Sequence, residues 1–273
     1  MEKIIDDVYV TKVGTNVLVN QNEDGSQSLN RSVLRSVGRQ ATVESNNVIV
    51  SSAAIAAGMI ETGTMVRPDK RAKMPELQRL SSIGQRHILN AWGESIHHED
   101  VGEVLLTRHT LDHNRAERHA EEERAEALKV IYTLLRHGEV PVVNENDAVT
   151  HDEISFGDND ILAATLAACM ARSSLFGNVR LLLLSDVNGV YADKDDPGTR
   201  IPIIENTADY RDLAQESDSD NGTGGMVSKF DAADIAQAAG VDMWIFDPRN
   251  NAHRNQAMRG KIGTYFPARS VEQ

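Results

Sequence analysis

The stretch Val140-Pro141-Val142-Val143-Asn144-Glu145-Asn146-Asp147 joins a short apolar run to four consecutive polar residues. A short run of continuous apolar character is typical of a strand buried on both faces, as in a parallel sheet. Polar side chains directly after such a strand lie where ligands bind in open α/β sheets, outside the carboxyl ends of the strands. Carboxylate and carboxamide groups gathered there need partners if they are buried. The stretch therefore predicts a parallel α/β fold with a polar ligand site at this edge.

The same alternation of apolar runs and helix-forming segments continues along the chain. Strands are predicted at residues 7–13, 48–50, 101–106, 140–143, 179–184 and 243–246, and helices at residues 30–44, 53–60, 75–96, 115–135, 160–171 and 225–239. Residues 25–28 and 193–202 are predicted as loops, and residues 216–222 as either a lid or an ordinary surface loop. Strands that alternate with helices predict a mainly parallel sheet covered on both sides.

Composition narrows the class of protein. Of the 273 residues, 40% are hydrophobic and 25% charged, which is ordinary for a globular protein with a sizeable core. No apolar run approaches the roughly 20 residues of a membrane span, and the N-terminus has no signal-peptide core, so we expect a cytoplasmic protein without membrane contact. The single cysteine, Cys169, excludes an intramolecular disulfide and fits a reducing compartment. The net charge of -13 argues against nucleic-acid binding, and leaves open both salt adaptation and a plain acidic surface.

A second polar cluster, Gly157-Asp158-Asn159-Asp160, opens the helix predicted at residues 160–171. Because Asp and Asn are preferred at helix N-caps, one member is expected to cap this helix. At least one carboxylate then remains to orient a lysine or a metal-bound phosphate. Together with the polar residues after the strand 140–143, this cluster suits a ligand that carries both ammonium and carboxylate groups.

A glycine-rich stretch, Thr223-Gly224-Gly225-Met226-Val227-Ser228-Lys229, opens the last predicted helix without matching a Walker A motif. The helix dipole disfavours a cation at Lys229 unless an anion is bound, so we favour a phosphate cradle over a glycine hinge. Lys12, just before a glycine at the end of the first strand, could face the same phosphate, although many strands end this way. Ser51-Ser52 is interpreted first as a helix cap and second as a ligand contact. The clusters together suggest phosphoryl transfer to an amino acid.

Read in order, these segments resemble the amino-acid kinase superfamily and, within it, the glutamate 5-kinase family. The matching stretches are residues 12–15 (KVGT), 51–58 (SSAAIAAG), 105–108 (LLTR), 140–147 (VPVVNEND), 156–160 (FGDND), 185–191 (SDVNGVY) and 222–229 (GTGGMVSK). The resemblance implies a three-layer αβα sandwich with a mainly parallel central sheet. It also implies a single domain over residues 1–273, with an amino-acid lobe near residues 1–175 and a nucleotide lobe near residues 176–267. Many relatives also carry a C-terminal PUA domain, which we do not expect within these 273 residues.

The resemblance further implies residue roles. The catalytic residues would be Lys12, Asp160 and Lys229, with Asp160 orienting the two lysines. Glutamate would contact Ser52, Asp147 and Asn159. ATP would be bound by Lys12, Ser185, Asp186, Thr223, Gly224, Gly225, Met226, Val227, Ser228 and Lys229. No protein ligands to a metal are expected, because Mg²⁺ would be held mainly by the ATP phosphates.

Members of this family phosphorylate the side-chain carboxylate of L-glutamate with ATP, the first step of proline biosynthesis. The resemblance therefore implies a cytoplasmic homo-oligomer that proline could inhibit by feedback. Two alternatives stay open: another kinase of the superfamily, acting on aspartate, acetylglutamate, carbamate or a nucleotide, and a non-catalytic amino-acid sensor of the same fold. The sensor is disfavoured because both phosphate lysines are present.

Two positions depart from the family pattern. Ala53 stands where many relatives have glycine, and would cost about 1 kcal/mol if that position needs a positive φ. The segment Glu126-Ala127-Leu128 stands where relatives often carry Asn-Ala-Arg, which puts some substrate or subunit contacts in doubt.

Overall fold

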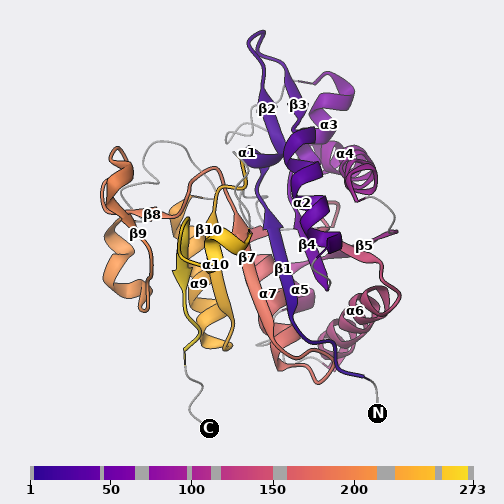
Figure 1. Cartoon of the computed structure of the whole chain (residues 1–273). Helices are drawn as coiled ribbons and strands as arrows, with labels where there is room; N and C mark the ends of the chain where they lie inside the picture. Colours follow the sequence, from indigo (N-terminus) through magenta and orange to yellow (C-terminus); the bar gives the residue numbers. More distant parts are fainter. Residues whose placement is uncertain are drawn as a thin grey trace.

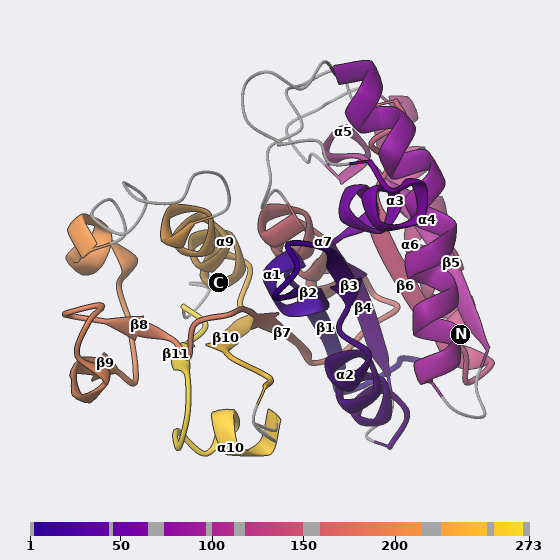
Figure 2. The same cartoon turned by 90° about the horizontal axis from the view of Figure 1, so that it is seen from above.

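A seven-stranded sheet runs through the centre of the molecule in the order β11-β10-β7-β1-β4-β6-β5 (Figure 2). The computed structural model describes residues 3–43, 46–64, 74–96, 100–111, 118–149, 159–213, 225–249 and 254–269. The parallel strands are β1 (Val8–Val13), β4 (Asn47–Ser51), β5 (Val101–Leu106), β6 (Val140–Glu145), β7 (Val179–Leu184) and β10 (Asp242–Phe246). All six were predicted. The antiparallel edge strand β11 (Thr264–Phe266) was not.

Helices cover both faces of this sheet, which makes the fold a three-layer αβα sandwich (Figures 1 and 2). One face carries α1 (Thr15–Leu18), α2 (Arg31–Val43), α3 (Ala54–Thr62), α4 (Met74–Ser95) and α10 (Arg254–Met258). The other face carries α5 (Arg108–Leu111), α6 (Arg118–Arg136), α7 (Asn159–Arg172) and α9 (Met226–Ala238). The predicted fold class is therefore confirmed.

Two predicted loops contain regular structure. Residues 25–28 overlap β3 (Gln27–Leu29), which forms a hairpin with β2 (Val19–Gln21). Residues 193–202 include the 3-10 turn η1 (Pro197–Thr199) and β9 (Arg200–Ile201), which pairs with β8 (Val190–Tyr191). A further 3-10 turn, η2 (Thr207–Tyr210), precedes α9. Strands this short and polar carry no readable period-two apolar pattern, so periodicity could not identify them.

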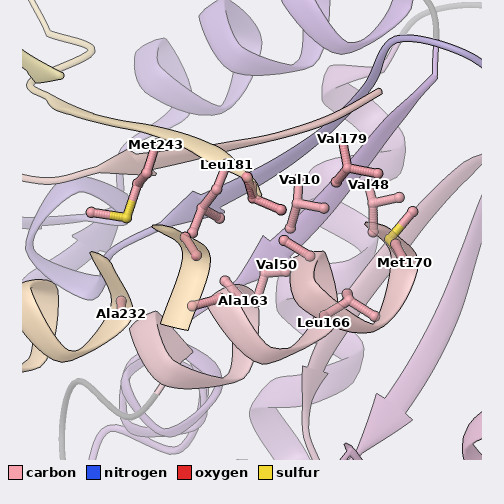
Figure 3. Packing of buried hydrophobic residues seen from close by; sticks show 14 of the residues in the cluster. Val10, Val48, Val50, Ala163, Leu166, Met170, Val179, Leu181, Ala232 and Met243 are labelled. Atoms are coloured by element: carbon pink, nitrogen blue, oxygen red, sulfur yellow. The ribbon is translucent and has the colours of Figure 1, made fainter. Parts of the chain in front are cut away.

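Helix α7 packs directly on the sheet, and four of its buried residues are alanines. Ala163 and Leu166 face Val10 and Val50 in the core (Figure 3). These side chains are at most 1% exposed, which leaves no space between helix and strands. This close packing fixes the first turn of α7, Asn159 and Asp160, beside the carboxyl ends of β1 and β4.

Helices α3 and α4 touch backbone to backbone at two glycines. A Cβ at Gly58 would lie 2.0 Å from the Leu80 carbonyl oxygen, and a Cβ at Gly84 would lie 1.8 Å from the Ala54 carbonyl oxygen. No side chain fits at either position. The contact holds the middle of α4 against the strand ends. Within the described residues, no helix is both long and apolar enough to cross a membrane.

Candidate active site

The polar residues singled out from the sequence gather at the carboxyl edge of the sheet. Lys12 lies on β1, the strand between β4 and β7, and pairs in register with Val50 of β4 and Leu183 of β7. The first turns of α7 and α9 begin at the same edge. This is the edge at which open α/β sheets bind ligands.

Lys12, Asp160 and Lys229 form a buried charged centre. The Lys12 Nζ atom lies 2.5 Å from Asp160 Oδ1, and the Lys229 Nζ atom lies 3.3 Å from Asp160 Oδ2. Ser228 Oγ donates to Asp160 Oδ2 over 3.0 Å. Lys12 and Lys229 are 5% and 8% exposed and Asp160 is 1% exposed. One carboxylate therefore holds two ammonium groups that are 217 positions apart in the sequence, as 229 minus 12 gives.

Burial and the attraction between opposite charges shift the pKa values of Asp160 and Lys12 in opposite directions. Burial alone would raise the pKa of Asp160, but the attraction of Lys12 and Lys229 outweighs it, so the pKa of Asp160 lies below its usual value. Burial lowers the pKa of Lys12, and the repulsion of Lys229 adds to this, while Asp160 opposes both. The two lysines and Asp160 together carry one positive charge in excess, which suits an anionic ligand group.

A neutral hydrogen-bonded row lies next to the charged centre. Asn159 Nδ2 donates to the Ser51 carbonyl oxygen over 2.7 Å, to Asn144 Oδ1 over 2.9 Å and, more weakly, to Ser52 Oγ over 3.4 Å. Asn144 Nδ2 donates in turn to Gln85 Oε1 over 2.9 Å. The structure thus joins Ser52 and Asn159, two of the three residues expected to contact glutamate.

Asp147, the third of these, sits against α4. Ser81 Oγ donates to Asp147 Oδ2 over 2.6 Å. Burial raises the pKa of Asp147, and the hydrogen bond from Ser81 opposes this shift. Among the described residues, no cation forms an ion pair with this carboxylate, which suits it to an incoming ammonium group.

The expected nucleotide residues divide between two segments. Ser185 follows β7, is 6% exposed and donates through Oγ to Asp186 Oδ1 over 3.2 Å. Asn16 Nδ2 donates to Asp186 Oδ2 over 2.9 Å, and Arg249 Nη2 donates to the Asp186 carbonyl oxygen over 2.8 Å. These bonds connect the ends of β1, β7 and β10.

The glycine-rich segment is described only from its third residue. Gly225 is the N-cap of α9, and Lys229 Nζ donates to its carbonyl oxygen, which is also an alternative acceptor to Asp160 for the Ser228 hydroxyl. Met226 and Val227 are partly buried in the first turn. Thr223 and Gly224 lie outside the described residues, as do Gly157 and Asp158 and the whole segment 216–222.

The cap interpretation of Ser51 and Ser52 is wrong. The N-cap of α3 is Ala53, which makes no side-chain cap and has φ +73° and ψ +14°, in the left-handed region. Ser51 Oγ instead accepts from Trp92 Nε1 over 2.9 Å and donates to the Ser52 carbonyl oxygen. Among the described residues, Ser52 Oγ has only the long contact with Asn159, so its hydroxyl can turn toward a ligand.

Sequence reasoning missed Asn16, Ser81 and Gln85. Asn16 and Ser81 contact the expected site residues Asp186 and Asp147, and Gln85 contacts Asn144 of the polar stretch after β6. Ser81 and Gln85 are one helical turn apart on α4, and Gly84 between them packs on α3. One sequence feature could have identified Ser81 and Gln85: a glycine and two polar residues lie on the inner side of an otherwise amphipathic helix.

The chemistry of the donor set bears on the metal expectation. Among the described residues, no group of three or more His, Cys, Asp or Glu side chains could hold a metal ion.

Sequence comparison finds a family model and relatives that match most of this chain. The Amino acid kinase family model matches residues 7–247. The glutamate 5-kinase of Shewanella amazonensis is 38% identical over 270 residues, which cover 95% of this chain and 66% of that protein. The glutamate 5-kinase of Novosphingobium aromaticivorans is 33% identical over 97% of this chain and 68% of its own length. The chain thus spans about two thirds of the length of these relatives.

Solved structures share the fold at low sequence identity. Carbamate kinase from Giardia lamblia bound to AMP-PNP superposes with a TM-score of 0.61 at 16% identity, over 98% of this chain and 99% of that one. An isopentenyl phosphate kinase substrate complex gives a TM-score of 0.61 at 14% identity, over 95% and 99% of the two chains. At these identities the likeness is one of fold.

Proposed function

The chain belongs to the amino acid kinase family, and from that membership we propose that it transfers the γ-phosphoryl group of ATP to the side-chain carboxylate of L-glutamate. The product would be L-glutamyl 5-phosphate. The observation that carries the proposal is the convergence of Lys12 and Lys229 on Asp160, together with relatives that are glutamate 5-kinases.

The proposed reaction needs charge compensation rather than a base. A carboxylate oxygen of glutamate attacks the γ-phosphorus, the bond from that phosphorus to the β–γ bridging oxygen breaks, and ADP leaves with the electron pair. Because the attacking carboxylate is already ionised at neutral pH, no proton has to be removed. The barrier comes from bringing an anion onto a triphosphate, and two buried ammonium groups lower it.

Each element of the site has a part in this proposal. Lys12 and Lys229 hold the phosphates and the migrating group, and Asp160 fixes where their ammonium groups lie. Asp147 and Asn159 offer acceptors for the substrate ammonium, and Ser52 offers a hydroxyl to its carboxylates. ATP would lie along the segments 185–186 and 223–229, and bound Mg²⁺ would neutralise its phosphates.

The wider expectations belong to the same proposal. The amino-acid lobe would lie near residues 1–175 and the nucleotide lobe near residues 176–267. The activity would open proline biosynthesis in the cytoplasm, with proline as a candidate feedback inhibitor and a homo-oligomer as the assembled form.

The test is turnover with a substrate panel. Purified protein with ATP and Mg²⁺ should release ADP when glutamate is added, and hydroxylamine should trap the acyl phosphate as glutamyl hydroxamate. Aspartate, N-acetylglutamate and carbamate, the substrates of the other kinases considered, should give at most a small fraction of that rate. A folded protein that binds ATP but releases no ADP with glutamate would overturn the proposal. Glutamate binding without turnover would indicate the sensor instead.

A further inference from the structure

Three carboxamides form a row that runs from the substrate side of the site to the surface. Asn159 donates to Asn144, Asn144 donates to Gln85, and Gln85 Nε2 donates to Glu103 Oε1 over 2.8 Å. The row crosses from α7 through β6 and α4 to β5. Asn144 is 2% exposed, Gln85 is half-buried and Glu103 is exposed.

Backbone groups fix which way the two asparagine amides in the row point. The Ser51 carbonyl can only accept, so it draws the Nδ2 atom of Asn159. The Glu145 N–H can only donate, and it donates to Asn144 Oδ1 over 2.9 Å. The Nδ2 atom of Asn144 must therefore face the other way, toward Gln85. A flipped Asn144 would set donor against donor at Glu145 and at Asn159.

This order leaves Asn159 with one group for a ligand. Its Nδ2 atom carries two hydrogens, and two acceptors within 2.9 Å take both. Only its Oδ1 atom can then meet a substrate, and an amide oxygen binds donors such as a primary ammonium. If Asn144 turned, one of these acceptors would be lost and Asn159 could rotate.

We propose that Gln85 is a positioning residue, which accepts the buried Nδ2 donor of Asn144 and so keeps the Asn159 oxygen toward the ammonium group of the substrate. The identity of that substrate as glutamate rests on the proposed function. Without Gln85 Oε1, the Asn144 donor is buried and unsatisfied, and the Asn144 side chain would swing toward another acceptor and weaken its hydrogen bond to Asn159.

The variants separate hydrogen bonding from packing. Gln85→Met keeps the length and volume of the side chain but removes the acceptor. Gln85→Glu keeps an acceptor for Asn144 but sets a second carboxylate against Glu103. The double variant Gln85→Glu with Glu103→Gln restores a donor toward residue 85. Asn90→Met is the control, because it replaces an exposed carboxamide on the same helix by methionine, as Gln85→Met does.

The expected result is a change in KM for glutamate. Gln85→Met should raise it about 5- to 30-fold, as expected for an unsatisfied buried donor, with KM for ATP unchanged. Gln85→Glu should raise it less, and the double variant should return it to near the wild-type value. Asn90→Met should leave it unchanged. Equal KM values in Gln85→Met and wild type would overturn the proposal, as would a larger effect of Gln85→Glu than of Gln85→Met.

A second measurement needs no substrate. In ligand-free protein with ¹⁵N-labelled asparagine, the side-chain NH₂ signal of Asn144, assigned by its loss in Asn144→Asp, should exchange slowly with solvent. Its exchange should be about tenfold faster or more in Gln85→Met and unchanged in Asn90→Met. Unchanged exchange in Gln85→Met would overturn the positioning role. If that exchange accelerates while wild-type protein shows no glutamate turnover, only the proposed function falls.

Discussion

Two neighbouring residues at the start of α7 belong to two differently built regions. Asp160 faces the charged centre, where one carboxylate holds two lysines, and Asn159 faces the amide row, where neutral groups are ordered by backbone donors and acceptors. The first region acts through charge that burial makes strong, and the second through hydrogen-bond direction. Removal of a group should therefore mainly cost stability and turnover in the first region, but substrate affinity in the second.

The largest effect is expected from Asp160→Asn, which breaks the charged centre. Two buried ammonium groups would lose their counter-charge, and the free energy of unfolding should fall by about 3–5 kcal/mol in urea denaturation. Because the folded-state pKa of Asp160 is lowered, its contribution is present above the unfolded pKa and is lost as the pH falls through the folded pKa.

The control is Asp195→Asn at an exposed position, which should change stability by less than about 0.5 kcal/mol. Equal stability of the two variants at neutral pH would mean that Asp160 does not hold the lysines together.

The next effect is on turnover. Lys229→Met should lower kcat by about 10²–10³-fold, because it removes one of the two charges on the migrating group, while KM for glutamate should change little. Lys12→Met should behave alike, although burial already lowers the pKa of Lys12. Steady-state kinetics, with glutamate and ATP varied in turn, will measure kcat and KM for both variants. A rise in glutamate KM at constant kcat would place the lysines with the substrate rather than the phosphate.

The sequence predicted the charged centre far better than the amide row. Lys12, Asp160 and Lys229 stand at a strand end or in the first turn of a helix, and the α/β topology brings such ends together. The local pattern at Lys12 is weak, and the family resemblance indicated its role. Gln85 and Ser81 lie in the middle of a long helix, where their positions depend on the backbone contact of Gly58 with Leu80. No local pattern encodes that contact. The edge strand β11 and the hairpin β2–β3 were missed because three-residue strands carry too little periodicity.

A smaller effect is expected at Asp147, which lies outside the charged centre and the amide row and is proposed to bind the substrate ammonium. Asp147→Asn should raise KM for glutamate about 10- to 100-fold, because an ammonium group would lose a charged acceptor. The folded-state pKa of Asp147 is raised by burial, so its ionised form costs stability as the pH rises through that pKa. The ligand-free Asp147→Asn variant should therefore be at least as stable as wild type at neutral pH.

The pH profile supplies the control for Asp147. Ser81→Ala removes the hydrogen bond that opposes the raised pKa, so the acid limb of kcat/KM for glutamate should move to higher pH. An acid limb that stays in place would separate Asp147 from glutamate binding.

The smallest effect concerns the turn that carries Ser52. Ala53 has φ +73°, a conformation that costs an L-residue about 1 kcal/mol, whereas Ala54 begins the regular helix α3. Both methyl groups are buried, at 7% and 4% exposure, so Ala53→Gly and Ala54→Gly lose similar packing. The first also relieves the left-handed backbone, while the second weakens a helix by about 0.5–1 kcal/mol. Ala53→Gly should therefore leave the protein more stable than Ala54→Gly by roughly 1–2 kcal/mol, measured by urea denaturation.

Because the Ser52 and Ala53 backbone stays in place, KM for glutamate should not change in Ala53→Gly. If it did, the alanine methyl itself would be shaping the substrate site, and the amide row alone would not account for affinity.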